Sequence, residues 1–153
     1  MKQKVRESWD SFFIRVVLLM ATRSTCSRVQ VGAVLTQDRR IISTGYNGVA
    51  GGATHCPDDL TDEAHHLFAV GHEIHAEANA LLFAARHGLA VEGTTLYVNV
   101  SPCQQCAKLI LQAGVARVCY YEVYDREDSG IQYLVNHGVA CDKLLRLEEN
   151  HEA

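Results

Sequence analysis

The sequence lacks the features that mark three common classes of protein. Its 14 Lys and Arg are outnumbered by 18 Asp and Glu, and the formal net charge is −4, whereas a protein that binds polymeric nucleic acid usually carries a basic surface. The apolar run at residues 12–21 is interrupted by Arg15 and is too short to span a bilayer. The charged start shows no signal-peptide cleavage site. We therefore expect no nucleic-acid polymer, no membrane and a cytoplasmic location.

The sequence also shows no internal repeat and no second domain. It has 153 residues, of which 48% are hydrophobic and 21% are charged, and these values suit one globular domain with a buried core. Six cysteines could suggest disulfides, but their spacing pairs them with histidines, so reduced thiols are expected. We predict a single domain over residues 1–153.

Two short motifs supply ligands of the kind that zinc prefers. His75-Ala76-Glu77 provides one imidazole, and Pro102-Cys103-Gln104-Gln105-Cys106 provides two thiolates. Three protein ligands, with the fourth position left to water, are typical of a catalytic zinc. The pattern H-x-E followed by P-C-x-x-C is the known signature of zinc nucleobase deaminases. We predict that His75, Cys103 and Cys106 bind zinc and that Glu77 carries a proton.

Local geometry supports this assignment. Cys103 and Cys106 are three residues apart and share a face if a helix starts there, and the positive end of that helix favours thiolates. His75 and Glu77 would point about 200° apart in a regular helix, so both reach one metal only if the helix begins at or just before His75. The alternatives are a structural zinc site, which needs a fourth protein ligand, and a redox C-x-x-C pair, which needs no His-x-Glu.

The apolar pattern predicts the order of the secondary-structure elements. Helices are expected over residues 8–22, 75–87, 103–113 and 128–137, and strands over residues 31–36, 41–45, 94–100, 115–121 and 139–147. The first two strands form a hairpin, and the later strands, which are joined by helices, should pair in parallel. This order predicts an α/β fold with a five-stranded mixed sheet. The expected core face of the helix at 75–87 consists of Ile74, Ala78, Leu81, Leu82 and Ala85.

A long polar loop is expected between the hairpin and the His-Ala-Glu motif, from Gly51 to about Gly71. It is rich in histidines and carboxylates and has little apolar material to hold it in place. A second metal could hold it, and a set of thiolates and imidazoles again favours zinc. The candidate ligands are Cys26 and Cys56 with one or two of His65, His72 and Glu73. A mobile polar loop with free thiols is the alternative.

Other polar residues are candidates for binding a small ligand. Arg23, Ser24 and Arg28 lie in one short segment that could hold a phosphate, although a solvated loop has the same composition. Asn47 ends a strand beside a glycine, where it could bind a ligand or simply form a turn. Tyr124 belongs to a cluster of tyrosines that could stack on a base, bind a phosphate or pack in the interior.

Over roughly residues 8–145 the sequence resembles the cytidine/deoxycytidylate deaminase superfamily, and within it the deoxycytidylate (dCMP) deaminases. The motifs that carry the resemblance are Arg23-Ser24, Val31-Gly32-Ala33, Gly45-Tyr46-Asn47-Gly48, residues 75–80 and residues 101–108. The resemblance implies a three-layer αβα cytidine-deaminase-like fold in one zinc-dependent domain. It also implies hydrolytic deamination of dCMP to dUMP with release of ammonia, which feeds thymidylate synthesis.

The resemblance further implies roles for individual residues. It assigns the catalytic zinc to the His-Cys-Cys set and proton transfer to Glu77. The substrate-binding residues that it implies are Asn47 for the sugar, Arg23, Ser24 and Arg28 for the phosphate, and Ala76, Ser101 and Tyr124 elsewhere in the site. The ligands that it implies for a second, structural zinc are Cys26, Cys56, His65 and Glu73. The His-rich loop departs from the family pattern and leaves this second set open.

Relatives in this family are often homohexamers that dCTP activates and dTTP inhibits, with Mg²⁺ accompanying the effector, so a homo-oligomer with these effectors is expected. Two rival functions stay open: a deaminase of another base, such as cytidine, guanine or adenosine in tRNA, and a nucleotide-binding zinc module without catalysis. The acidic net charge argues against a tRNA enzyme. A free-nucleoside enzyme would not need Arg23 and Arg28, and zinc binding alone would not need Glu77.

Overall fold

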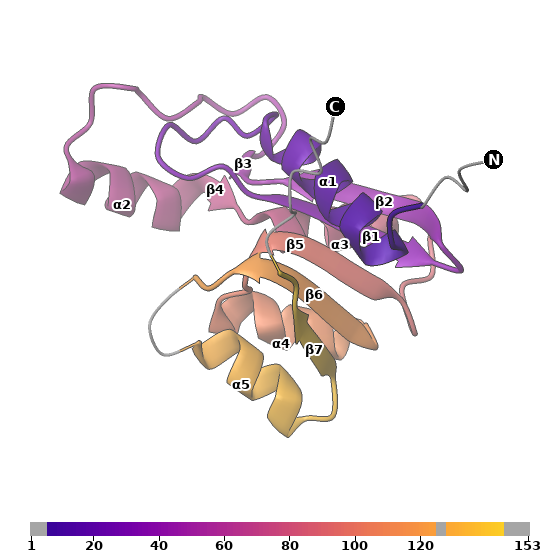
Figure 1. Ribbon diagram of the computed structural model, residues 1–153. Helices are drawn as coiled ribbons and strands as arrows, with labels where there is room; N and C mark the ends of the chain where they lie inside the picture. Colours follow the sequence, from indigo (N-terminus) through magenta and orange to yellow (C-terminus); the bar gives the residue numbers. More distant parts are fainter. Residues whose placement is uncertain (1–5, 125–127, 146–153) are drawn as a thin grey trace, which may run out of the picture.

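A five-stranded mixed sheet forms the centre of the molecule (Figure 1). In this computed structural model, which describes residues 6–124 and 128–145, β1 pairs antiparallel with β2 and β5, whereas β5, β6 and β7 are parallel. The strands in spatial order are β2 (Arg40–Tyr46), β1 (Gly32–Gln37), β5 (Thr95–Val100), β6 (Arg117–Glu122) and β7 (Ala140–Lys143). The predicted mixed sheet is confirmed; the end of the predicted last strand, at 146–147, lies outside the described residues.

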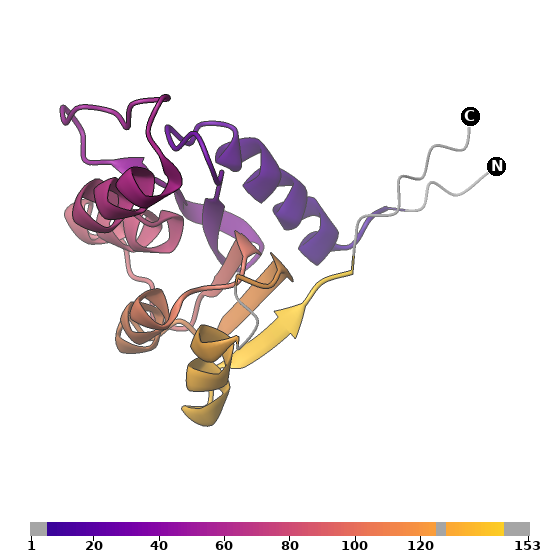
Figure 2. The same cartoon turned by 90° about the vertical axis from the view of Figure 1, so that its left-hand side faces the viewer.

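Helices cover both faces of the sheet, as Figure 2 shows. Helix α1 (Trp9–Ala21) lies on one face, and α3 (Ala76–Arg86), α4 (Gln104–Gln112) and α5 (Ser129–Asn136) cover the other. Successive strand residues point to opposite faces, so Val34 packs against α1 whereas its neighbours Ala33 and Leu35 belong to the larger core on the other side. The predicted three-layer αβα arrangement is confirmed. None of the helices in the described residues is long and apolar enough to cross a membrane.

Helix α3 lies very close to strand β2. Its buried alanines, Ala76, Ala80 and Ala84, recur every four residues along one face. Gly45 of β2 faces the first two: a Cβ at Gly45 would collide with the carbonyl oxygen of Ala76 and lie 2.6 Å from the amide nitrogen of Ala80. The Ser43 hydroxyl also donates a 2.6 Å hydrogen bond to the carbonyl oxygen of Ala80. These contacts fix the start of α3 over the sheet.

The predicted core face of α3 is confirmed for Leu81, which packs against the core, and is wrong for Leu82 and Ala85. Leu82, 58% exposed, and Ala85 face solvent, and Leu81 is only half-buried. The prediction combined large and small apolar side chains at helical spacing and did not include Ala76, Ala80 or Ala84. The close approach of helix and strand instead selects the smallest ones, which carry a weak hydrophobic signal.

The expected loop from Gly51 to Gly71 contains a helix, α2 (Asp62–His72), so this expectation is wrong for its second half. The Thr61 hydroxyl caps the helix by accepting a 3.2 Å hydrogen bond from the Ala64 N–H. Asp62 in the first turn suits the positive end of the helix. None of the α2 residues is fully buried, so the apolar periodicity that predicts a helix is missing. Figure 1 shows α2 projecting beyond the sheet.

A second, two-stranded ribbon connects α2 to the rest of the domain. Strand β3 (Gly48–Val49) pairs antiparallel with β4 (Glu73–Ile74). Because β3 follows Asn47 and β4 precedes His75, the ribbon brings these two residues to the same region of the molecule. Each strand has two residues, which is too short to give an alternating pattern in the sequence.

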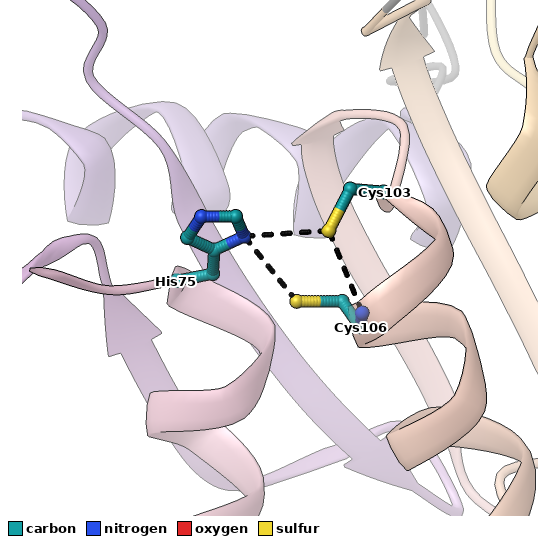
Figure 3. A group of neighbouring side chains, drawn as sticks. All are labelled: His75, Cys103 and Cys106. Atoms are coloured by element: carbon teal, nitrogen blue, oxygen red, sulfur yellow. Dashed lines mark hydrogen bonds between the residues drawn. The ribbon is translucent and has the colours of Figure 1, made fainter. Parts of the chain in front are cut away.

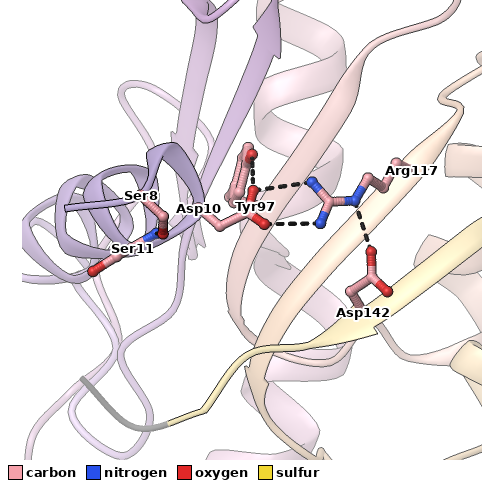
Figure 4. Close-up of polar contacts among 6 residues, drawn as sticks. All are labelled: Ser8, Asp10, Ser11, Tyr97, Arg117 and Asp142. Atoms are coloured by element: carbon pink, nitrogen blue, oxygen red, sulfur yellow. Dashed lines mark hydrogen bonds and ion pairs between the residues drawn. The ribbon is translucent and has the colours of Figure 1, made fainter. Parts of the chain in front are cut away.

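A charged network ties α1 to the sheet (Figure 4). Arg117 of β6 donates two 2.9 Å hydrogen bonds to the carboxylate of Asp10 on α1 and one of 2.7 Å to Asp142 of β7. The Tyr97 hydroxyl of β5 donates to Asp10 at 2.6 Å. The Arg117 guanidinium holds the pKa of Asp10 below its usual range, which keeps this carboxylate charged. The network thus joins one helix to three neighbouring strands.

Gly45→Ala is expected to destabilise the fold. The added methyl group would collide with the backbone of α3, and overpacking of this kind typically costs about 1–3 kcal/mol. The measurement is the free energy of unfolding from urea melts. Gly71→Ala is the control: its Cβ meets open space, and alanine is the better helix former by about 0.5–1 kcal/mol. A Gly45→Ala protein as stable as the wild type would contradict the close packing.

Candidate active site

The two sequence motifs meet where α3 and α4 begin (Figure 3). His75 and Cys103 are the N-cap residues of these helices, with extended backbone at φ −68°, ψ 152° and φ −68°, ψ 166°. The Nδ1 atom of His75 lies 3.5 Å from the Cys103 Sγ atom and 3.4 Å from the Cys106 Sγ atom. The expected start of the helix at His75 is confirmed to within one residue. The extended backbone at His75 turns the ring toward both sulfurs.

The spacing of these atoms fits a tetrahedral zinc ion. With Zn–N about 2.0–2.1 Å and Zn–S about 2.3 Å, a tetrahedral ion holds the ring nitrogen about 3.5 Å from each sulfur. The observed separations are 3.4 and 3.5 Å. All three ligand atoms lie within 4.8 Å of one another, and no other His, Cys, Asp or Glu of the described chain joins this group. The arrangement supports a zinc ion with an open fourth position rather than a closed structural site.

Neighbouring groups hold Cys103 in place and favour its thiolate. A hydrogen bond with the Cys106 thiol is the main cause that lowers the pKa of Cys103, and the His75 ring acts in the same direction. The Cys106 backbone N–H points at the Cys103 sulfur at 3.5 Å. Helix α5 packs against this turn through Gly130, where a Cβ would overlap the carbonyl oxygen of Pro102. The two thiols are therefore set on a turn that is braced from behind.

Glu77 lies in the first turn of α3 and faces the same pocket. It is only 4% exposed, and burial raises the pKa of its carboxyl to about 7. A carboxyl whose pKa lies near the working pH can both accept and release a proton. Its oxygens lie outside the three-ligand group, as expected for a proton carrier.

Residues of both motifs line a pocket of about 420 Å³. This volume falls in the range of about 300–1,000 Å³ found for small-molecule sites. Its walls come from the 26–31 segment, helix α2, the start of α3 and the turn after β5. The predicted substrate-binding residues that line it are Arg28, Asn47, Ala76, Ser101 and Tyr124. The lining does not include Arg23 or Ser24.

Asn47 and Ser24 hold the wall that residues 29–31 form. The Asn47 side-chain oxygen accepts a hydrogen bond from the Val31 N–H, and its amide donates to the Val29 carbonyl oxygen, both at 2.8 Å. The Ser24 hydroxyl donates to the Asn47 carbonyl oxygen at 2.9 Å. Ser24 therefore acts behind the wall. Arg23 is exposed at the end of α1.

The remaining predicted residues that line the pocket are the buried Ser101 and the more exposed Arg28 and Tyr124. The Ser101 hydroxyl oxygen accepts a 2.7 Å hydrogen bond from the Tyr124 N–H, and the Tyr124 side chain is 56% exposed. The Arg28 guanidinium is paired with Asp62 at the start of α2 and donates to the Leu60 carbonyl oxygen at 2.7 Å. Arg28 thus joins two walls of the pocket.

A second group of metal-type ligands lies beside the first. The Cys26 sulfur, a ring nitrogen of His65 and a carboxylate oxygen of Glu73 lie within 4.8 Å of one another, and the Cys26 Sγ and His65 Nε2 atoms are 3.4 Å apart. Cys56 is buried, but its sulfur lies outside this group, so its role stays a prediction. The other candidate, His72, is also outside the group, and its ring packs at a tilt against that of Phe68.

Comparison with known proteins places this geometry in a family. The model of the cytidine and deoxycytidylate deaminase zinc-binding region matches residues 7–122. The chain belongs to the cytidine and deoxycytidylate deaminase family. ComE operon protein 2 of Bacillus subtilis (strain 168) is 38% identical over 141 residues, covering 91% of this chain and 72% of that protein.

Two further relatives carry a named activity. The deoxycytidylate deaminase of Enterobacteria phage T4 is 36% identical over 156 residues, covering 78% of this chain and 81% of that protein. The crystal structure of the dCMP deaminase from the cyanophage S-TIM5, in complex with dCMP and dUMP, matches with a TM-score of 0.81 at 30% identity. That match covers 92% of this chain and all of the cyanophage chain. The family resemblance inferred from the motifs is confirmed.

Among the α2 residues that line this deaminase pocket, the sequence analysis identified only His65. The lining residues of the helix are Asp62, His65, His66 and Ala69. They are spaced i, i+3, i+4 and i+7, so they share one face. The signal that could have found them is Thr61 as a capping residue, followed by two acids in the first turn.

Cys103→Ser is expected to lower the zinc content by one ion per chain, because a serine hydroxyl does not replace a thiolate as a zinc ligand. The measurement is elemental analysis of the purified protein. Cys141→Ser is the matched control, since this cysteine is half-buried and lies outside both ligand groups. Wild-type zinc content in the Cys103 variant would contradict the assignment.

Proposed function

We propose that this chain, as a single domain, is a zinc-dependent deaminase that hydrolyses dCMP to dUMP and releases ammonia. The observation that carries the proposal is the grouping of the His75 nitrogen with the Cys103 and Cys106 sulfurs, beside the buried Glu77 that lines the same pocket as His75 and Cys103. The named relatives support the substrate, since one is a deoxycytidylate deaminase and another was solved with dCMP and dUMP. The product dUMP would feed thymidylate synthesis.

The role of Glu77 is to move protons. A zinc ion held by His75, Cys103 and Cys106 would lower the pKa of water and so make hydroxide available near neutral pH. Glu77 takes the proton that the water loses and delivers it to N3 of the cytosine ring, while the water oxygen forms a bond to C4. Glu77 then carries the second water proton to the C4 amine. The C4–N bond breaks, ammonia leaves and the uracil ring remains.

The residues around the reaction centre are proposed to orient the nucleotide. Ala76 and Ser101 lie beside the ligand group and line the pocket, and Asn47 has a further lone pair and N–H for the sugar. Tyr124 stands at the mouth, where its ring can cover the ligand. Arg23 and Ser24 are assigned an indirect role. Ser24 holds Asn47 through a hydrogen bond, and Arg23 lies at the end of α1.

Glu77→Gln is expected to keep its zinc and to lose turnover by roughly 10²–10⁴-fold, because an amide of the same size does not exchange protons as a carboxylate does. Ammonia release from dCMP measures turnover, and elemental analysis measures zinc. Glu92→Gln, at an exposed position outside the pocket lining, should match the wild type. Full activity in the Glu77 variant would remove this residue from the mechanism.

A substrate screen separates the rival functions. Ammonia release is compared for dCMP, dCTP, cytidine, guanine and tRNA adenosine, with and without added dCTP and dTTP. Preferred turnover of dCMP supports the proposal, and preference for another base refutes it. Binding of zinc and dCMP without any ammonia release would favour a non-catalytic nucleotide-binding module.

We also infer a second zinc site at Cys26, His65 and Glu73, with Cys56 as the predicted fourth ligand. The closeness of the three ligand atoms and their thiolate–imidazole–carboxylate chemistry support it. Cys26→Ser is expected to lower the zinc content from two ions to one per chain and to lower the melting temperature, since the site ties α2 and β4 to the 23–28 segment. Two zinc ions in the Cys26 variant would contradict this inference.

Several expectations stay predictions that rest on the family resemblance. They are assembly into a homo-oligomer, with a hexamer favoured, control by dCTP and dTTP, Mg²⁺ bound with the effector, and a cytoplasmic location. The acidic net charge supports a nucleotide rather than a nucleic-acid polymer as partner.

A further inference from the structure

A nucleoside monophosphate brings a group that the pocket must satisfy. At neutral pH its phosphate carries close to two negative charges and presents oxygens that accept hydrogen bonds, so it requires N–H or O–H donors. The lining side chains that offer such donors outside the first zinc group are Arg28, Asn47, His65, His66, Ser101 and Tyr124.

Several of these donors already have partners. The Asn47 amide holds the backbone of the pocket wall. The Arg28 guanidinium donates to the Asp62 carboxylate at the start of α2 and to the Leu60 carbonyl oxygen. The His65 ring faces the Cys26 sulfur in the second ligand group. Each of these side chains is thus partly committed to holding the pocket walls together, and the remaining Asn47 N–H is the one proposed above for the sugar.

His66 differs from them. Its side chain is exposed and lines the pocket, and its ring makes no hydrogen bond or ion pair with any residue in the described parts of the chain. It lies on the same face of α2 as Asp62, one turn away. Because Arg28 pairs with Asp62, the acidic side chain on this face is compensated and does not leave an unpaired charge to repel an anion.

We propose that His66 binds the 5′-phosphate of the substrate and so makes the enzyme prefer a nucleotide to the corresponding nucleoside. This inference rests on the proposed function. An imidazole carries at least one N–H donor whether it is neutral or charged, so the ring can donate to a phosphate oxygen in either form. The one pocket contains both Glu77, at the reacting end of the ligand, and the α2 wall.

The test compares His66→Ala with the wild type as full-length, zinc-loaded proteins. The KM for dCMP should rise about 10- to 100-fold, as expected for loss of one hydrogen bond to a charged group, while kcat for dCMP stays within a few-fold. Both constants for deoxycytidine, which has no phosphate, should be unchanged. His66→Gln keeps an N–H donor and should recover part of the affinity.

His72→Ala is the matched control, because it removes the same residue type from the same helix at a position outside the pocket lining. It should leave the KM for dCMP at the wild-type value. Calorimetric binding of dUMP and deoxyuridine gives a second readout that does not depend on turnover. The wild type should bind dUMP more tightly, and His66→Ala should lose most of that preference.

The outcomes separate this inference from the proposed function. If His66→Ala keeps the wild-type preference for dUMP over deoxyuridine, and for dCMP over deoxycytidine, the role of His66 is refuted while dCMP deamination stands. If the wild type binds dUMP no more tightly than deoxyuridine, no phosphate site exists and the inference fails. If the zinc-loaded wild type releases no ammonia from dCMP, the proposed function fails, and the inference that rests on it fails too.

Discussion

The close contact between α3 and β2 sets the position of the reaction centre. Gly45 has no side chain, and Ala76 and Ala80 have small ones, so the helix lies against the strand with its backbone nearly touching it. With the helix held there, His75 lies just outside its first turn and Glu77 just inside it. The packing of the α3 backbone on β2 therefore fixes the positions of both Glu77, the proton carrier, and His75, the metal-type ligand. Larger side chains at this contact would lift α3 and carry the His75 nitrogen away from the two sulfurs.

The electrostatics of the site follow from the same arrangement. Two helix starts converge on one point, and the positive ends of helices favour the anionic forms of the cysteines. Burial acts on Glu77 in the opposite sense, because it raises the pKa of the carboxyl to about 7. The site thus combines a Cys103 thiol that loses its proton readily with a carboxyl that holds one near neutral pH. A metal ligand set and a proton carrier need these opposite tendencies.

The sequence was sufficient for the sheet, the layers and the two motifs, because these depend on burial of large apolar residues and on ligand types at fixed spacing. The start of the helix at His75 followed from the angle between neighbouring helix positions. The buried face of α3 was missed because it is made of alanines, and α2 was missed because it buries none of its residues. Ser24 was predicted to bind the phosphate because the composition of the 23–28 segment does not show which of its side chains face the pocket.

Helix α2 has a consequence for how this enzyme can change. It forms one wall of the pocket, yet its eleven residues contribute none to the buried core, and substitutions at exposed positions usually alter stability little. The catalytic framework and the ligand-facing wall are therefore under separate constraints. A protein divided in this way can acquire new ligand preferences, by drift or by design, through substitutions on one short helix that keep His65 for the second ligand group, while the machinery that breaks the C–N bond is inherited intact.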